Sequence, residues 1–150
     1  MKVYVASSWR NERQPAVVKA LRAAGHDVYV FKSPDSAHPT FHWSDIDPKW
    51  LHWDEDDLMR GLGHRIAEEA YKSDFDAMEW ADTCVLVMPC GRSAHLEAGW
   101  FVGKGKGCAI LLDGGEPELM QKMATLHTSI DDVIAAIANV DVRREEEATQ

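Results

Sequence analysis

One stretch, residues 84–112, limits the folds open to this chain more than any other part of it. It begins with the apolar run CVLVM at 84–88, whose length and β-branched residues are typical of a strand buried on both faces. After a short loop, Ser93 is placed to cap a helix over 94–103, and a group of glycines ends that helix. A second apolar run follows at 108–112. The stretch therefore predicts a βαβ unit with two parallel strands.

The beginning of the chain has the same pattern. Residues 2–6 predict a strand, and residues 14–24 predict a helix with Pro15 in its first turn and Gly25 at its end. Residues 27–31 then predict a second strand. The two strands are expected to be parallel because a helix connects them.

The end of the chain adds smaller elements. The pattern predicts a short helix at 117–123, an edge strand at 124–127, and a final amphipathic helix that Thr128 or Ser129 caps and that continues to 138. The charged tail at 141–150, rich in Arg and Glu, is predicted to be frayed.

Four to five strands alternating with helices predict an α/β fold in a single domain over residues 1–140. We expect a doubly wound, flavodoxin-like parallel sheet in the order 2-1-3-4-5, with helices on both faces. In such a sheet the ligand crevice lies where the strand order reverses, between the loops that leave strands 1 and 3.

The charge of the chain excludes some partners. Its net charge is −9, and no basic run or stripe is present to release counterions from a phosphate polymer. We therefore expect no nucleic-acid polymer and no anionic membrane as a partner, and any bound phosphate to be a single one. The first strand is too short for a signal peptide, and no window approaches the length of a membrane span, so a cytoplasmic location is predicted.

The three cysteines, Cys84, Cys90 and Cys108, lack the spacing of a metal site or a redox motif. Cys84 and Cys108 fall within predicted strands and are interpreted as small core residues. Cys90 falls in a loop and is a weaker candidate for the site.

Residues 33–63 differ from the rest of the chain. They contain three prolines, Phe41 with three tryptophans, and three histidines, with no sustained period. An insert of this length is more often a functional loop or lid than filler. Its aromatic residues would either stack on a planar ligand or cap the open end of the sheet. His38 and His42 are spaced like metal ligands but lack companions, so we predict neither a metal nor another cofactor.

Residues 64–80 predict an amphipathic helix, and one acid falls on its apolar stripe. Asp74 lies one turn after Ala70 and one turn before Met78. A carboxylate that faces a core is costly unless it is paired, hydrogen-bonded or used. Asp76 falls outside the stripe and is interpreted as solvated, and Asp82 as a residue that ties down a turn.

A second acid, Glu97, lies alone on the apolar helix after strand 3. It either complements the positive end of that helix or acts in the crevice. The two crevice loops supply hydroxyl groups, guanidinium groups and the free N–H groups of a helix start, a combination that holds one phosphate or carboxylate. The substrate-binding candidates are Ser7, Ser8, Trp9, Arg10, Gly91, Arg92 and Ser93. Two acids, an anion site and aromatic residues point to chemistry at a sugar carbon.

These segments resemble the nucleoside 2-deoxyribosyltransferases and the related 2'-deoxynucleoside 5'-phosphate N-hydrolases. KVYVASSWRNER at 2–13 is similar to their first strand and loop, in which Ser8, Arg10 and Arg13 match a nucleotide-binding pattern. SDFDAMEWAD at 73–82 is similar to a stretch with a catalytic Asp eight residues before a second one, a spacing that selects Asp74. GRSAHLEAG at 91–99 is similar to the loop and nucleophile helix, with Glu97 at the nucleophile position.

The resemblance implies a function and has departures. It implies an N-glycosidic bond hydrolase acting on a nucleoside 5'-monophosphate or a close relative, with Glu97 as nucleophile, Asp74 in proton transfer and Tyr4 orienting the Glu97 carboxylate. It also implies a homo-oligomer. The transferases carry an Asp six residues before the nucleophile, where this chain has Gly91, and Arg92 replaces a small residue. The first departure weakens a transferase assignment, and the arginine suits a 5'-phosphate.

Two alternatives remain open at this stage. The same glycosyl-enzyme would support base exchange between deoxynucleosides, and a non-catalytic module would sense a nucleotide in the same crevice. A phosphoacceptor receiver domain is disfavoured because strand 1 ends in Ser7 and Ser8 where that fold needs acids. A flavodoxin is disfavoured because Trp9 and Arg10 do not suit its phosphate loop.

Overall fold

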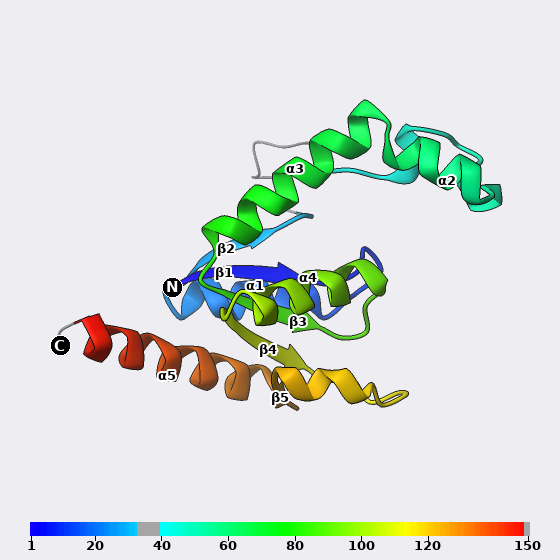
Figure 1. Ribbon diagram of the computed structural model, residues 1–150. Coiled ribbons are helices and arrows are strands. Elements are labelled where there is room, and N and C mark those ends of the chain that lie inside the picture. The colour runs from blue at the N-terminus through cyan, green and yellow to red at the C-terminus, as the bar shows by residue number, and fades with distance from the viewer. Residues whose placement is uncertain (33–39, 149–150) are drawn as a thin grey trace. The chain divides into compact units, whose positions relative to one another are not determined.

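The computed structural model describes residues 1–32 and 40–148, and Figure 1 shows the elements along the chain. These residues form two compact units, one of residues 1–30 with 80–148 and the other of residues 31–32 with 40–79. The described part of the predicted insert, residues 40–63, belongs to the second unit, and His38 lies outside the described residues.

The first unit contains a parallel sheet of five strands in the order β2-β1-β3-β4-β5, as predicted. Its strands are β1 (Lys2–Ala6), β2 (Asp27–Val30), β3 (Thr83–Val87), β4 (Gly107–Leu111) and β5 (Thr125–His127). Its helices are α1 (Gln14–Ala23), α4 (Arg92–Gly103), the 3-10 helix η3 (Leu119–Met123) and α5 (Ile130–Ala148). At the end of α1, Gly25 has a φ of +88°, a conformation that favours glycine.

Helices cover both faces of this sheet. Val17 and Leu21 of α1 and Val133 of α5 share one buried cluster with Val3 of β1 and Val85 of β3. Successive strand residues point to opposite faces, so the alternate strand positions face α4. Tyr4 of β1 accordingly packs against Phe101 of α4, with ring centroids 5.7 Å apart.

Within its described residues, the second unit contains two 3-10 turns and two helices. These are η1 (Trp43–Asp45), η2 (Trp50–His52), α2 (Glu55–Leu62) and α3 (Arg65–Trp80), the last of which continues one residue into the first unit. Asp54 begins α2 with a capping box, because Asp54 Oδ1 accepts from the Asp57 main-chain N–H at 2.8 Å.

Two local expectations are corrected by the structure. α4 begins at Arg92 with Gly91 as its N-cap, so Ser93 lies inside the first turn and is not the cap. α5 continues to Ala148, so residues 141–148 are helical and not frayed. Arg and Glu favour helices and no glycine or proline interrupts this tail, which is the physical reason for its continuation. Ser129 caps α5 as predicted, since its Oγ accepts from the Asp132 N–H at 3.1 Å.

Candidate active site

The strand order reverses between β1 and β3, and the loops that follow these two strands lead to opposite faces of the sheet. The loop after β1 leads into α1 on one face, and the loop after β3 leads into α4 on the other. Ser7, Ser8, Trp9 and Arg10 follow β1, while Gly91, Arg92 and Ser93 begin α4. The substrate-binding candidates therefore lie on the two loops that border the switch point of the sheet.

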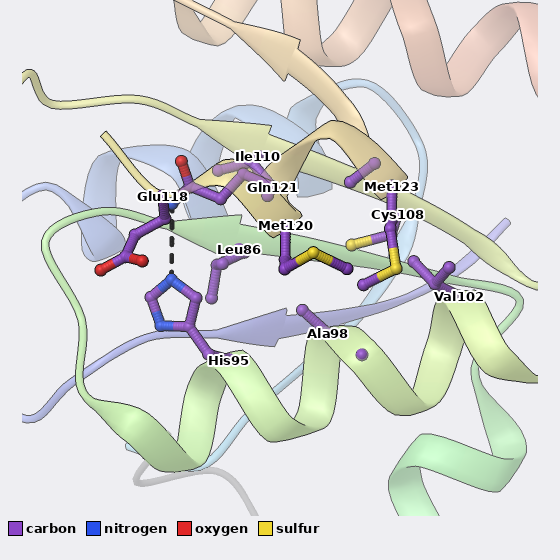
Figure 2. A pocket seen from close by; sticks show the side chains of 12 residues that line it. Leu86, His95, Ala98, Val102, Cys108, Ile110, Glu118, Met120, Gln121 and Met123 are labelled. Atoms are coloured by element: carbon purple, nitrogen blue, oxygen red, sulfur yellow. Dashed lines mark hydrogen bonds between the residues drawn. The ribbon is translucent and has the colours of Figure 1, made fainter.

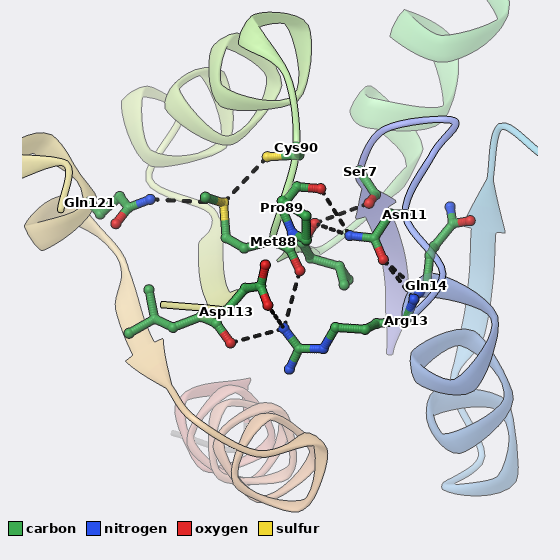
Figure 3. Close-up of polar contacts among 11 residues, drawn as sticks. Ser7, Asn11, Arg13, Gln14, Met88, Pro89, Cys90, Asp113 and Gln121 are labelled. Atoms are coloured by element: carbon green, nitrogen blue, oxygen red, sulfur yellow. Dashed lines mark hydrogen bonds and ion pairs between the residues drawn. The ribbon is translucent and has the colours of Figure 1, made fainter. Parts of the chain in front are cut away.

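Asn11 joins these two loops and is buried, with 3% of its surface exposed. Its side-chain nitrogen donates to the carbonyl oxygens of Val87 at 2.9 Å and Pro89 at 3.0 Å (Figure 3). Its side-chain oxygen accepts from the main-chain N–H groups of Arg13 and Gln14. One amide thus satisfies groups of the β3 loop and of the α1 start together.

Asn11 is not among the site residues predicted from the sequence, although a signal for it is present. Asn11 stands three residues before the start of the helix predicted at 14–24, and Asn is a residue type whose side chain often binds main-chain N–H groups ahead of a helix. Gln14 is itself buried, and its side-chain nitrogen is the one buried side-chain N or O atom without a hydrogen-bond partner among residues 1–32 and 40–140.

Arg13 holds the ends of β3 and β4 together. Its Nη1 donates to the carbonyl oxygens of Met88 at 3.1 Å and Leu112 at 2.9 Å, and lies 3.6 Å from an Asp113 carboxylate oxygen (Figure 3). Ser7 also binds this region, since its hydroxyl donates to the Val87 carbonyl at 3.0 Å. Arg13, which matches the nucleotide-binding pattern in sequence, therefore has main-chain partners.

Other members of the candidate set are open to solvent. Trp9 is 44% exposed, and Arg10, Arg92 and Ser93 are exposed as well. Because its N-cap is Gly91, α4 has no side chain at that position to cap the N–H groups of its first turn. This end of α4 thus presents a guanidinium, a hydroxyl and main-chain donors, the groups that bind anions at helix starts.

Glu97 lies in the second turn of α4, and its charge acts on two thiols. Burial raises the pKa of Cys90 to about 11, and the negative charge of Glu97 adds to this effect. Burial also raises the pKa of Cys84 in β3, with a smaller contribution from Glu97. The charge of Glu97 therefore acts on a thiol within β3 and on one in the loop that follows β3.

The prediction that two of the cysteines are core residues is confirmed. Cys84 and Cys108 are buried and stand opposite each other on β3 and β4. Cys90 lies in the loop and is half-buried.

Tyr4, the third catalytic candidate, is 1% exposed in β1. Its ring lies between Tyr29, with centroids 5.4 Å apart, and Phe101 of α4. The ring therefore has a packing role whatever its hydroxyl does.

Three acids of α3 and of the turn before β3 were considered from the sequence. Asp74 is on α3 in the second unit. Asp76 is exposed and forms an ion pair with Lys72, which agrees with its interpretation as a solvated residue. Asp82 accepts from the Lys2 main-chain N–H at 2.9 Å and ties the start of β1 to the turn before β3, as predicted.

A separate cavity of about 150 Å³ lies beside α4 (Figure 2). Its walls are mainly apolar and include Leu86, Ile110 and Met120, and Glu97 is not among its lining residues. At its polar end, His95 Nδ1 is 3.0 Å from the Gly91 carbonyl oxygen, and His95 Nε2 is 3.4 Å from the Gln121 amide nitrogen. The imidazole is therefore oriented from both ring nitrogens.

Comparison with known proteins supports this architecture. A 2-deoxyribosyltransferase from the psychrotolerant bacterium Bacillus psychrosaccharolyticus is 20% identical, with a TM-score of 0.59 over 89% of this chain and 90% of that one. A conserved protein from Enterococcus faecalis V583 is 12% identical, with a TM-score of 0.58 over 93% and 98%. A CMP N-glycosidase from Clostridium botulinum is 16% identical, with a TM-score of 0.49 over 92% and 99%.

The first two of these proteins share the fold of this chain. The flavodoxin-like α/β class predicted from the sequence is confirmed, and the chain has the fold of a 2-deoxyribosyltransferase. No protein-family model and no curated protein matches the sequence. Within residues 1–32 and 40–148, no helix has the length and apolar character needed to cross a membrane.

Proposed function

We propose that this chain is an enzyme that hydrolyses the N-glycosidic bond of a nucleoside 5'-monophosphate or a close relative. The observation that supports this most is the position of Glu97. It is an acid on the helix that follows the central strand β3, beside a switch point bordered by exposed Arg10 and Arg92. Open α/β sheets bind ligands at that point. The shared fold with a 2-deoxyribosyltransferase adds support for chemistry at a nucleoside sugar.

In the proposed reaction, a carboxylate oxygen of Glu97 attacks C1' of the sugar. The C1'–N bond breaks, the base leaves with its electron pair, and a glycosyl ester forms on Glu97. Asp74 delivers a proton to the leaving base and then accepts one from the attacking water, which releases the sugar phosphate and restores Glu97. Tyr4 orients the Glu97 carboxylate.

The phosphate is proposed to bind Ser8, Arg10, Arg92, Ser93 and the N–H groups of the first turn of α4, with Ser7, Trp9 and Gly91 bordering the same site. Guanidinium groups and helix starts are the usual partners of a single phosphate. Arg10→Ala or Arg92→Ala should raise the KM for a nucleotide by about tenfold or more, and the KM for the matching nucleoside much less. Equal effects on both substrates would remove the phosphate from this part of the proposal.

The decisive experiment is Glu97→Gln assayed for release of free base from a panel of nucleoside monophosphates. Loss of a nucleophile should lower kcat by about a thousandfold or more. Glu116→Gln, in an exposed loop, is the control and should keep full activity. A mass spectrum of the wild-type protein, denatured after brief contact with substrate, should show one sugar phosphate on the peptide that contains Glu97. Full turnover by Glu97→Gln would end the proposal.

Asp74 has a matched control two residues away. Asp74→Asn should lower kcat by about a hundredfold or more, because proton transfer in both half-reactions is lost. Asp76→Asn removes an exposed acid that is paired with Lys72 and should leave kcat within about twofold. If both variants behave alike, Asp74 has no special part in the reaction.

Base exchange is the second candidate, because one protein with this fold is a 2-deoxyribosyltransferase. A second free base added to the reaction should leave the yield of released sugar unchanged if water is the acceptor. Formation of a new nucleoside would assign the chain to transfer instead. We also propose a homo-oligomer, which light scattering on the purified protein would test directly.

A further inference from the structure

Three tryptophans of the second unit line one cavity of about 410 Å³. Trp43 belongs to η1, Trp50 belongs to η2, and Trp53 directly follows η2. Asp54, Glu55 and Leu58, from the start of α2, complete the lining. We call this cavity the tryptophan pocket. Its volume is within the range of small-molecule sites.

The rings of the tryptophan pocket are held in place by the protein itself. The Trp53 indole N–H donates to an Asp47 carboxylate oxygen at 2.7 Å. A Cβ atom added to Gly61 would lie 2.3 Å from the Trp53 ring, so this ring packs directly on the α2 main chain. Trp43 meets Trp53 at an interplanar angle of 71°, with ring centroids 5.6 Å apart. The two rings form a fixed corner, which lowers the entropic cost of binding.

The third ring, Trp50, is also oriented. His42 meets it edge-on, at 88° and with centroids 5.7 Å apart. The His42 ring in turn accepts from the Ser44 main-chain N–H at 3.2 Å. His42, considered from sequence as a metal ligand, is thus part of the frame around Trp50.

The charge around the tryptophan pocket is negative. Between residues 40 and 63, six carboxylates stand against only Lys49 and Arg60. Arg60 forms an ion pair with Asp57. The hydrogen bond from Trp53 lowers the pKa of Asp47, so that carboxylate stays ionised. A cation is therefore favoured over an anion at this site.

The start of α2 does not reverse this preference. The Asp57 main-chain N–H donates to Asp54 Oδ1 at 2.8 Å, and the Asp54 main-chain N–H donates to Asp57 Oδ2 at 3.3 Å. Their carboxylates satisfy donors that would otherwise attract an anion.

We propose that the tryptophan pocket binds an organic cation, of the quaternary ammonium or methylated amine class. The faces of indole rings attract such cations through the ring quadrupole, and Trp is the strongest of the aromatic residues in this respect. The carboxylates of Asp54 and Glu55 supply the opposite charge. A neutral planar ligand would also stack on these tryptophan rings, but it would gain nothing from the negative charges of Asp54 and Glu55. This binding activity is separate from the proposed glycosidic reaction and does not depend on it.

The test compares choline with 3,3-dimethylbutan-1-ol, which has the same shape with carbon in place of the charged nitrogen. Each is titrated into the full chain, and binding is followed by tryptophan fluorescence and calorimetry at low salt. Choline should bind about tenfold more tightly than the neutral alcohol. Equal affinity would reduce the site to an apolar cavity and overturn the proposal, as would no detectable binding of choline.

Two adjacent acids of α2 provide the matched variants. Glu55 lines the pocket and Asp56 does not, although both lie in the first turn of α2. Glu55→Gln should weaken choline binding about three- to tenfold, and Asp56→Asn less than about twofold. Equal weakening by both variants would assign binding to the general charge of the region and contradict a specific pocket.

A ring variant supplies a second, independent readout. Trp50→Leu should weaken choline binding about tenfold or more, because one aromatic face of the pocket is lost. Trp50→Phe keeps a smaller ring and should retain intermediate affinity, which protects the test if the leucine variant does not fold. Unchanged affinity in a folded Trp50→Phe and a folded Trp50→Leu would exclude this pocket as the choline site.

Discussion

The side-chain nitrogen of Asn11 lies 2.9 Å from the carbonyl oxygen of Val87, although the two residues are 76 positions apart in the chain. The same nitrogen donates to Pro89, and the side-chain oxygen accepts two N–H groups at the start of α1. Asn11 thereby sets the distance between the two loops of the candidate site.

Replacement of Asn11 should therefore destabilise the protein. Asn11→Ala leaves several buried main-chain groups without partners, and we expect the free energy of unfolding to fall by about 3 kcal/mol. Chemical denaturation measures this loss, and a change below about 1 kcal/mol would contradict it. Asn11→Asp keeps the acceptor for Arg13 and Gln14 but places a carboxylate against two carbonyl oxygens. The free energy of unfolding of Asn11→Asp should lie below that of the wild type by an amount that shrinks as the pH falls, because the protonated carboxyl group can donate to a carbonyl oxygen.

Two arginines of the same loop should separate stability from binding. Arg13→Ala removes the donor shared by Met88 and Leu112, and should lower the free energy of unfolding by about 2 kcal/mol. Arg10 is exposed, so Arg10→Ala should change stability by less than about 0.5 kcal/mol. Thermal unfolding of both variants, with nucleotide kinetics on Arg10→Ala, tests this division. A stable Arg13→Ala would show that the carbonyl groups find other donors.

Tyr4 allows a packing role to be distinguished from a positioning role. Tyr4→Phe keeps the ring between Tyr29 and Phe101 and should cost less than about 1.5 kcal/mol of stability, whereas Tyr4→Ala should cost about 3–5 kcal/mol. If the hydroxyl orients Glu97, Tyr4→Phe should lower kcat at least about tenfold and shift the acidic limb of the pH profile, with KM little changed. An unaltered kcat and profile would leave Tyr4 as a packing residue only.

The Cys90 thiol reports the charge of Glu97. With its pKa at about 11, the folded thiol resists alkylation near pH 8. Glu97→Gln removes one cause of the raised pKa, so iodoacetamide should modify Cys90 faster, and the midpoint of the rate against pH should move down. Peptide mass spectrometry assigns the modification. An unchanged midpoint would show that burial alone raises the pKa.

The same shift predicts a dependence of stability on pH. The folded pKa of Cys90 is raised from 9.0 to about 11, so its contribution to stability is complete below pH 9 and is lost as the pH rises through 11. Between pH 8 and 11, the free energy of unfolding should therefore decrease more steeply with pH for the wild type than for Cys90→Ser. Parallel curves would contradict a raised pKa at this residue.

Much of the architecture follows from local sequence pattern. The run at 2–6 predicts β1 and the structure has Lys2–Ala6, while the run at 84–88 predicts a strand that is observed at Thr83–Val87. The strand order 2-1-3-4-5 agrees with the doubly wound class that the alternation of strands and helices predicts, in which each βαβ unit has one permitted hand. Apolar periodicity and chirality are properties of short segments, so the sequence alone is enough to predict them.

Helix ends were less predictable than helices. Ser93 has the residue type of a cap, but the chain leaves β3 in a path that makes Gly91 the N-cap. The start of α4 is therefore determined by how the β3 loop packs, and residue preference for caps is too weak to overrule that packing.

The sequence by itself determined the strands, their order and the acids and arginines available to a site at the switch point. Only the tertiary structure decided how the side chains of that region are used. Arg13 binds main-chain carbonyl groups, 99 residues away in the case of Leu112, and Asn11 rather than a predicted residue joins the two loops. Contacts between residues so distant in the chain depend on the folded positions of both, and no local pattern contains that information.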